Sequence, residues 1–225
     1  MRIAELFYSL QGEGSLLGVP SIFIRTSGCN LRCTWCDTPY TSWQPEGDER
    51  TLEQILDELQ QWMPAAKHVV VTGGEPMIAP EIVALTERLC ALGLHITIET
   101  AGTVFQPVAC DLMSISPKLA NSTPPGPWSE RHDRTRIQPA ALTELIRRYD
   151  YQLKFVMATP EDLEEVRSLV QSLAADVRRV ILMPEGTDRE RLLERSLWLA
   201  GICKQEGFRF SPRLHVDLYG NRRGV

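Results

Sequence analysis

The sequence lacks any run of about 18 apolar residues, the length that a membrane-spanning helix needs, and its first residues lack the basic and apolar regions of a secretion signal. It also lacks long runs of one charge: charged residues make up 24% of the 225 positions, and the formal net charge is -5. These absences argue against a membrane protein and against a nucleic-acid-binding surface. We therefore expect a cytoplasmic protein that acts on a small molecule, with no membrane or nucleic-acid partner.

The sequence has six cysteines, and three of them are clustered at Cys29, Cys33 and Cys36. Thiols stay reduced in the cytoplasm, so metal ligands, reactive groups or small buried side chains are better interpretations than a disulfide framework. Cys90 and Cys203 lie in predicted helices, where we expect them to be small buried side chains.

Short β-branched runs alternate with segments of helical periodicity along most of the chain. Strands are predicted at residues 21–25, 68–72, 95–99, 112–116, 152–156 and 180–183, with a last one within 208–215. Helices are predicted at residues 52–59, 82–92, 140–148, 160–173 and 189–206. Residues 121–133, dense in proline and polar side chains, are expected to form an irregular loop.

Repeated strand and helix units imply parallel strands joined by right-handed crossovers. We predict an α/β fold in a single domain over residues 1–225: an incomplete, TIM-type barrel of parallel strands. A doubly wound open sheet is the alternative.

The three clustered cysteines stand as C-x3-C-x2-C directly after a predicted strand and Gly28. A compact loop of this kind brings three thiolates to one side, so that three irons of a cluster are ligated and a fourth is left open. Zinc sites more often use paired C-x2-C units or added histidines to close four ligands, and the sequence has no second pair. The spacing favours an iron–sulfur cluster held by Cys29, Cys33 and Cys36.

With Trp35 before the last cysteine, this loop resembles the signature of the radical S-adenosylmethionine (SAM) superfamily. The resemblance implies a barrel with the cluster loop after its first strand, and a 4Fe-4S cluster whose open iron binds the amino and carboxylate groups of SAM. Reductive cleavage of SAM would give a 5'-deoxyadenosyl radical that abstracts hydrogen. TGGEP at residues 72–76 resembles the superfamily motif for the methionine amino group, although alone it is equally compatible with a tight turn.

Motifs spread over nearly the whole chain resemble one family, 7-carboxy-7-deazaguanine synthase of queuosine biosynthesis. They include Glu5, Phe7, SLQGEG at residues 9–14, and the later Gly18 and Pro20. The resemblance implies a carbon-nitrogen lyase that converts 6-carboxy-5,6,7,8-tetrahydropterin to 7-carboxy-7-deazaguanine with release of ammonia, a step in 7-deazapurine synthesis.

The same resemblance assigns roles to individual residues. The cluster and SAM would be bound by the three cysteines and by Trp35, Cys36, Asp37, Gly73, Gly74, Glu75, Ser116, Pro117 and Lys118. The substrate would be bound by Leu10, Gln11, Gly12, Glu13, Arg25, Thr72, Glu99 and His215, and Thr38 would help to hold Mg2+.

These residue types suit those roles. Carboxylate, amide and hydroxyl groups can pair with the donors and acceptors of a pterin edge, Arg25 can bind a carboxylate through two nitrogens, and Mg2+ prefers oxygen ligands. Each of these residues also has a purely structural interpretation: a surface ion pair for Arg25, a strand-end carboxylate for Glu99 and an ordinary histidine near a sheet edge for His215. Lys154 can contact a ligand or reach solvent, and the sequence does not separate these outcomes.

The expected partners are a second copy of the chain, in a homodimer, and an external electron donor such as flavodoxin. The last residues resemble one branch of the family, and we assign no site role to Arg222, Arg223 or Val225. A glycyl-radical activating enzyme would share the cysteine loop and GGEP but not SLQGEG. A non-catalytic electron carrier or a zinc-stabilised binding module is the alternative from another class.

Overall fold

The computed structural model describes residues 1–225, in which nine strands form one sheet. The strands run in the order β3-β1-β2-β4-β5-β6-β7-β8-β9. All neighbours from β2 to β9 are parallel, whereas β1 is antiparallel to β2 and to β3. The strands are β1 Arg2–Leu10, β2 Pro20–Thr26, β3 Asp48–Glu49, β4 His68–Gly73, β5 His95–Thr100, β6 Leu112–Ile115, β7 Tyr151–Met157, β8 Val180–Pro184 and β9 Arg209–Phe210.

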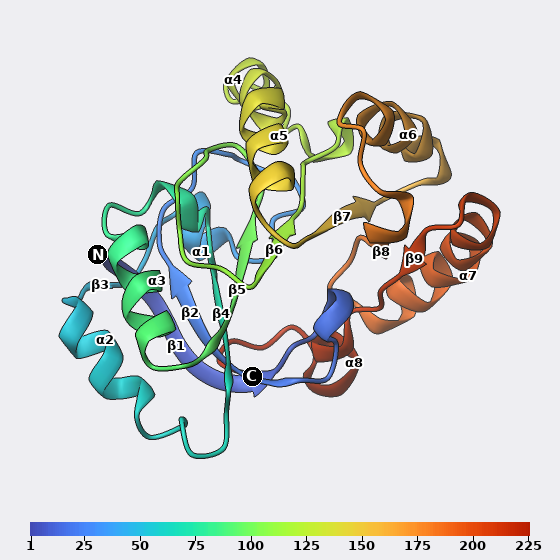
Figure 1. Ribbon diagram of the computed structural model, residues 1–225. Helices are drawn as coiled ribbons and strands as arrows, with labels where there is room; N and C mark the ends of the chain where they lie inside the picture. The colour runs from blue at the N-terminus through green and yellow to red at the C-terminus, as the bar shows by residue number, and fades with distance from the viewer.

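The sheet curves into an open ring with the longer helices along its outer side (Figure 1). The helices are α1 Pro39–Ser42, α2 Leu52–Leu59, α3 Ile82–Ala91, α4 Ser129–Arg136, α5 Pro139–Arg148, α6 Leu163–Ser172, α7 Arg189–Glu206 and α8 Leu214–Tyr219. Short 3-10 turns are η1 Gly14–Leu16, η2 Pro76–Ile78, η3 Ala120–Ser122, η4 Pro160–Asp162 and η5 Val177–Arg179. Because β9 does not pair with β1 or β3, the barrel is incomplete. The predicted α/β partial barrel is confirmed, and the doubly wound alternative, which needs helices on both faces, is wrong.

Helix α2 begins where its sequence predicts. The hydroxyl of Thr51 accepts a hydrogen bond from the backbone N–H of Gln54 (3.2 Å), and the Gln54 side chain accepts one from the backbone N–H of Thr51 (2.9 Å). This reciprocal cap satisfies two backbone donors that the first turn leaves unpaired. Ile55 and Leu59 then face the core, where both are fully buried.

Side chains of the parallel strands divide between two sides of the sheet. In β7, the residues at every second position from Tyr151 to Met157 join a core of 33 buried residues under the outer helices, whereas Lys154 and Val156 line an internal cavity. Successive side chains on a strand point to opposite faces, so the residue next to a core residue faces the barrel interior. The same alternation holds for the pairs Ile24 and Arg25, Val71 and Thr72, and Ile98 and Glu99.

An apolar plug fills one part of the barrel interior. The rings of Phe7 and Phe23 stack with centroids 4.8 Å apart, and Val70 packs with them. Since both rings also border the cavity, they form an apolar part of its wall. Polar side chains are concentrated nearer the carboxyl ends of the parallel strands.

Three of the sequence-based expectations are wrong. Helix α4 begins inside the stretch 121–133, which the sequence predicts to be an irregular loop. Its polar residues face solvent, and its buried His132 holds it in place. The His132 ring accepts a hydrogen bond from the backbone N–H of Arg32 (3.0 Å) and pairs with Ser122 Oγ (2.9 Å). The last strand stops at Phe210, and His215 lies in α8 instead. Cys90 is exposed rather than buried, because it lies on the outer face of α3; Cys203 is buried as expected.

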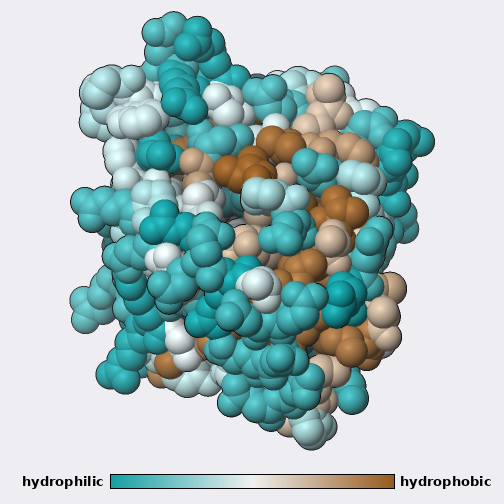
Figure 2. Space-filling model, turned by 90° about the vertical axis from the view of Figure 1, so that its left-hand side faces the viewer, coloured by the Kyte–Doolittle hydropathy of each residue, from teal (hydrophilic) through white to brown (hydrophobic).

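The outer surface is mainly hydrophilic on the side that carries the N-terminus, α2 and α3. Figure 2 shows this face, where a discontinuous band of hydrophobic residues crosses a largely hydrophilic surface. Every helix is too short or too polar to cross a bilayer.

Candidate active site

A cavity of about 450 Å³ opens at the carboxyl ends of the parallel strands. Its walls combine strand residues with the loop after β1, the cysteine loop after β2 and the C-terminal segment. A volume of this size suits small-molecule ligands. The carboxyl ends of barrel strands are also where enzymes of this architecture place their sites.

The cysteine loop forms one wall. Cys29, Cys33 and Cys36 all line the cavity, and Cys33 is buried against Leu31 and Ala101. Burial raises the pKa of the Cys29 thiol to about 12 and that of Cys33 to about 11, so a thiolate there needs a positive partner such as iron.

The three thiols fit an iron–sulfur cluster better than a single metal ion. No three His, Cys, Asp or Glu side chains converge closely enough to hold one ion. A cluster instead places each thiolate on a different iron. Ser42 Oγ lies 3.3 Å from Cys36 Sγ, and the Trp43 indole N–H donates to the backbone oxygen of Cys33 (3.0 Å), so the loop is held from behind.

The TGGEP segment packs closely against the end of β2 and the start of the cysteine loop. A Cβ added to Gly73 would lie 2.2 Å from the backbone oxygen of Thr26, and one on Gly74 would lie 2.2 Å from that of Gly28. Gly73 also has a φ of +143°, a conformation that side chains disfavour. Both glycines border the cavity, so the backbone there can approach a ligand closely.

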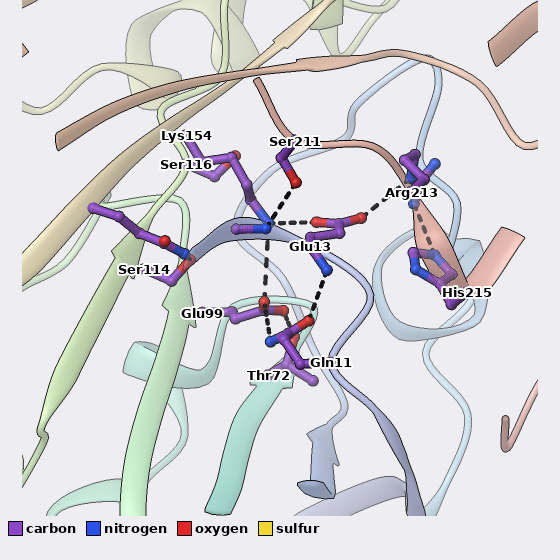
Figure 3. Close-up of polar contacts among 12 residues, drawn as sticks. Gln11, Glu13, Thr72, Glu99, Ser114, Ser116, Lys154, Ser211, Arg213 and His215 are labelled. Carbon is purple, nitrogen blue, oxygen red and sulfur yellow. Dashed lines mark hydrogen bonds and ion pairs between the residues drawn. The ribbon is translucent and has the colours of Figure 1, made fainter. Parts of the chain in front are cut away.

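A buried polar network forms the facing wall (Figure 3). The Lys154 ammonium forms an ion pair with Glu13 and lies 3.9 Å from Glu99. The Glu99 carboxylate accepts hydrogen bonds from the Gln11 amide (3.2 Å) and the Thr72 hydroxyl (3.1 Å). The loop after β1 and strands β4 and β7 therefore all contact the Glu99 carboxylate at the end of β5.

The charges in this network hold each other ionised. Burial alone would raise the pKa of Glu13, but Lys154 and Arg213 more than offset it and bring the pKa well below its usual range. Burial alone would lower the pKa of Lys154, but Glu13 and Glu99 raise it overall. Both groups are thus charged at neutral pH.

Arg25 lies on the same wall. Its Nε donates to Glu5 Oε2 (2.7 Å), the Tyr40 hydroxyl donates to that same oxygen (2.7 Å), and the guanidinium lies 5.5 Å from the centre of the Phe7 ring. The two terminal nitrogens of Arg25 have no hydrogen-bond partner in the protein, and the side chain borders the cavity. They are free to bind a carboxylate.

Comparison with known proteins gives this arrangement a family. Residues 23–136 match the model of the radical SAM superfamily. A 7-carboxy-7-deazaguanine synthase of Halobacterium salinarum is 47% identical, with 98% of this chain and 91% of the relative aligned; one of Rhodopirellula baltica is 44% identical, over 100% and 89%. The chain belongs to the 7-carboxy-7-deazaguanine synthase family. It is therefore a radical SAM lyase, whose superfamily uses a 4Fe-4S cluster and SAM.

The fold agrees with that of another 7-carboxy-7-deazaguanine synthase family structure. The crystal structure of QueE from Escherichia coli superposes with a TM-score of 0.70 at 28% identity, over 95% of this chain and 94% of that one. Family membership places the chain outside the glycyl-radical activating enzymes and the non-catalytic carriers.

Most residues that the resemblance selected lie around the one cavity. On the substrate side these are Leu10, Gln11, Gly12, Glu13, Arg25, Thr72, Glu99 and His215; on the cofactor side they are Cys29, Cys33, Trp35, Cys36, Asp37, Thr38, Gly73, Gly74, Ser116 and Lys118. The Trp35 indole N–H is held by the Asn121 backbone oxygen (3.0 Å), and Lys118 donates to Ser116 Oγ (3.0 Å).

Glu75 and Pro117 do not border the cavity of this synthase family member. The Glu75 carboxylate is turned into the protein, where it accepts hydrogen bonds from the Thr100 hydroxyl (2.7 Å) and the backbone N–H groups of Ala101 (2.8 Å) and Met77 (3.1 Å). Burial raises its pKa. Glu75 thus joins the ends of β4 and β5.

Several cavity residues were missed by sequence reasoning. They are Tyr40, Ser42, Ser114, Met183, Glu185, Gly186, Arg213 and the tail residues 221–225, together with Lys154, which was left undecided. Lys154 carried a signal, because a lysine inside an apolar strand is rarely buried without a partner. The tail was given no site role despite its resemblance to one branch of the family; in the structure it borders the cavity, and the Arg223 guanidinium lies 3.5 Å from the centre of the Tyr40 ring.

Substituting Gly73 with alanine should destabilise the protein by about 1–3 kcal/mol, because the new methyl group meets backbone in a disfavoured conformation. Thermal unfolding measures the effect. Gly201 within α7 is the matched control: its added Cβ meets nothing within 4 Å, so Gly201→Ala should leave stability unchanged or raise it. Equal melting temperatures for Gly73→Ala and the unsubstituted protein would contradict the tight approach.

Proposed function

We propose that this chain converts 6-carboxy-5,6,7,8-tetrahydropterin to 7-carboxy-7-deazaguanine with release of ammonia, in queuosine biosynthesis. The observation that carries this proposal is that one cavity has the three cysteines on one wall and the Arg25, Glu99 and Lys154 network on the other. We also propose that residues 1–225 act as one radical SAM domain in the cytoplasm; the continuous sheet from β1 to β9 supports the first of these.

Cys29, Cys33 and Cys36 would hold the 4Fe-4S cluster. Trp35, Asp37, Gly73, Gly74, Ser116 and Lys118 would surround SAM, because they border the cavity beside the cysteines. When bound, the cluster and SAM supply the radical that removes a hydrogen atom from the substrate. The chain's own residues orient the two ligands and exclude water.

On the facing wall, Arg25 would bind the pterin carboxylate through its two unpartnered nitrogens. Gln11, Glu13, Thr72 and Glu99 offer amide, hydroxyl and carboxylate groups to the pterin edge. Leu10, Gly12 and His215 complete this side of the cavity. Thr38 borders the cavity near Asp37 and would give a hydroxyl ligand to Mg2+, with the substrate carboxylate as another.

The test is an anaerobic assay. The protein is reconstituted with iron and sulfide, reduced, and given SAM, 6-carboxytetrahydropterin and a range of Mg2+ concentrations, and the deazaguanine is measured by mass spectrometry. Product formation that rises with Mg2+ supports the whole proposal. If 5'-deoxyadenosine forms without deazaguanine, the substrate assignment fails; if product formation ignores Mg2+, the metal assignment fails.

A homodimer and an external electron donor such as flavodoxin complete the proposal. Both rest on the resemblance to the family, and the hydrophobic band in Figure 2 supports an interface with a second copy. Sedimentation at several protein concentrations tests the dimer. Replacing the chemical reductant by reduced flavodoxin in the assay tests the donor.

A further inference from the structure

Arg213 occupies a buried junction between four segments of the chain. It directly precedes α8 and is 7% exposed. Its Nε donates to Glu13 Oε1 (3.1 Å), one terminal nitrogen donates to the Gly186 backbone oxygen (2.6 Å), and the other forms an ion pair with Asp37. The second terminal nitrogen also lies 3.5 Å from His215 Nε2.

The two carboxylates that Arg213 joins belong to opposite sides of the cavity. Glu13 is part of the Lys154 network, whereas Asp37 directly follows Cys36 in the cysteine loop. No other side chain forms ion pairs with both of them. One guanidinium therefore bridges the loop after β1 and the cysteine loop.

The junction lies where the barrel has no backbone ladder. Since β9 does not pair with β1, the C-terminal segment meets the loop after β1 through a few separate contacts. The backbone N–H of Leu214 donates to the Gly12 oxygen (2.9 Å), and that of Gly14 donates to Ser211 Oγ (2.8 Å). These two bonds hold α8 against the loop after β1 but do not reach the cysteine loop, to which Arg213 is joined by its ion pair with Asp37.

We propose that Arg213 is a positioning residue that fixes the substrate relative to the SAM side of the cavity. This inference rests on the proposed function. Hydrogen transfer requires the reacting atoms to be nearly in contact, and a displacement of about 1 Å can cost about 100-fold in rate. A shift between the two walls would leave SAM cleavage intact while separating the radical from the pterin.

Arginine suits this position in a way that other cations do not. Its planar guanidinium presents donors in several fixed directions, so it can bind two carboxylates and a carbonyl at once. Lysine keeps the charge on a single nitrogen, and glutamine keeps hydrogen bonding without charge. Arg213→Lys and Arg213→Gln thus separate charge from bridging.

The experiment compares these two variants with Arg167→Gln as a control. Arg167 also binds a carboxylate through two nitrogens (3.0 and 2.6 Å to Glu206), but it joins α6 to α7 outside the cavity. For each reconstituted protein, iron content, deazaguanine and abortive 5'-deoxyadenosine are measured. We expect normal iron content and a ratio of 5'-deoxyadenosine to deazaguanine at least about 10-fold higher in both Arg213 variants, with no change in Arg167→Gln.

A second readout does not depend on activity. Hydrogen exchange followed by mass spectrometry should show faster exchange in residues 11–16 and 36–42 of both Arg213 variants, but not of Arg167→Gln. If product falls while the ratio and the exchange stay unchanged, Arg213 has no positioning role. If the unsubstituted protein makes no deazaguanine, the proposed function fails, and the exchange data alone decide whether Arg213 joins the two segments.

Discussion

Replacing Cys33 with alanine is expected to abolish both cluster assembly and SAM cleavage. Cys33 is the most buried of the three loop cysteines, and only Cys29 and Cys36 would remain on that wall. Since the cluster needs one thiolate on each of three irons, the two remaining thiolates would leave a second iron without a protein ligand. Iron and sulfide content and visible absorbance measure assembly, and chromatography of 5'-deoxyadenosine measures cleavage.

Cys90→Ala is the control for this experiment. Cys90 is exposed on α3 and does not border the cavity, so its variant should assemble the cluster and cleave SAM as the unsubstituted protein does. A Cys33→Ala protein that retained cluster and cleavage would overturn the ligand assignment.

Replacing Lys154 with methionine is expected to lower the free energy of unfolding by about 3–5 kcal/mol at neutral pH. The side chains of Lys154 and Glu13 are only 6% and 13% exposed. Removing the ammonium leaves buried carboxylates short of positive charge, while methionine fills a similar volume. Urea titration at pH 7 measures the loss.

The pH dependence of this loss has a definite sign. Because the folded protein holds the pKa of Glu13 below the ordinary value of 4.5, the ionised carboxylate stabilises the fold above that pH, and this contribution is lost as the pH falls. The gap between Lys154→Met and the unsubstituted protein should therefore shrink in acid. At the alkaline end, the raised pKa of Lys154 gives stability that is present below its ordinary 10.5 and lost as the pH rises through the folded value.

A double variant separates charge from packing. Adding Glu13→Gln to Lys154→Met removes the carboxylate that lost its partner, so part of the lost stability should return. If the double variant is no more stable than Lys154→Met, the destabilisation comes from the altered shape of the side chain and not from an unpaired charge.

Local patterns predicted the parallel strands well. The β-branched run at residues 68–72 became β4, which spans His68–Gly73, and the run at 152–156 lies inside β7, which spans Tyr151–Met157. The helix predicted at residues 189–206 matches the observed bounds of α7, Arg189–Glu206. β4 and β7 are buried over most of their length, so they appear in the sequence as short β-branched or apolar runs.

The parts that sequence reasoning missed depend on distant contacts. Arg213 pairs with Glu13 and Asp37, which lie 200 and 176 positions away, so no local pattern marks it. The end of the chain reads as a strand, but only Arg209 and Phe210 find a neighbouring strand, beside β8, and the following residues turn into α8 against the loop after β1. Tertiary contacts overrode local propensity there.

The alternation of side chains along the strands gives the fold two rows of residues, one facing the outer core and one facing the cavity. The outward residues Ile24, Val71 and Ile98 pack in the core, whereas the inward residues beside them, Arg25, Thr72 and Glu99, line the cavity where the proposed substrate would bind. The backbone pairing of β2 with β4 and of β5 with β6 keeps both rows in register. A redesign of this barrel for another substrate would therefore substitute the inward-facing residues and keep the outward-facing residues unchanged.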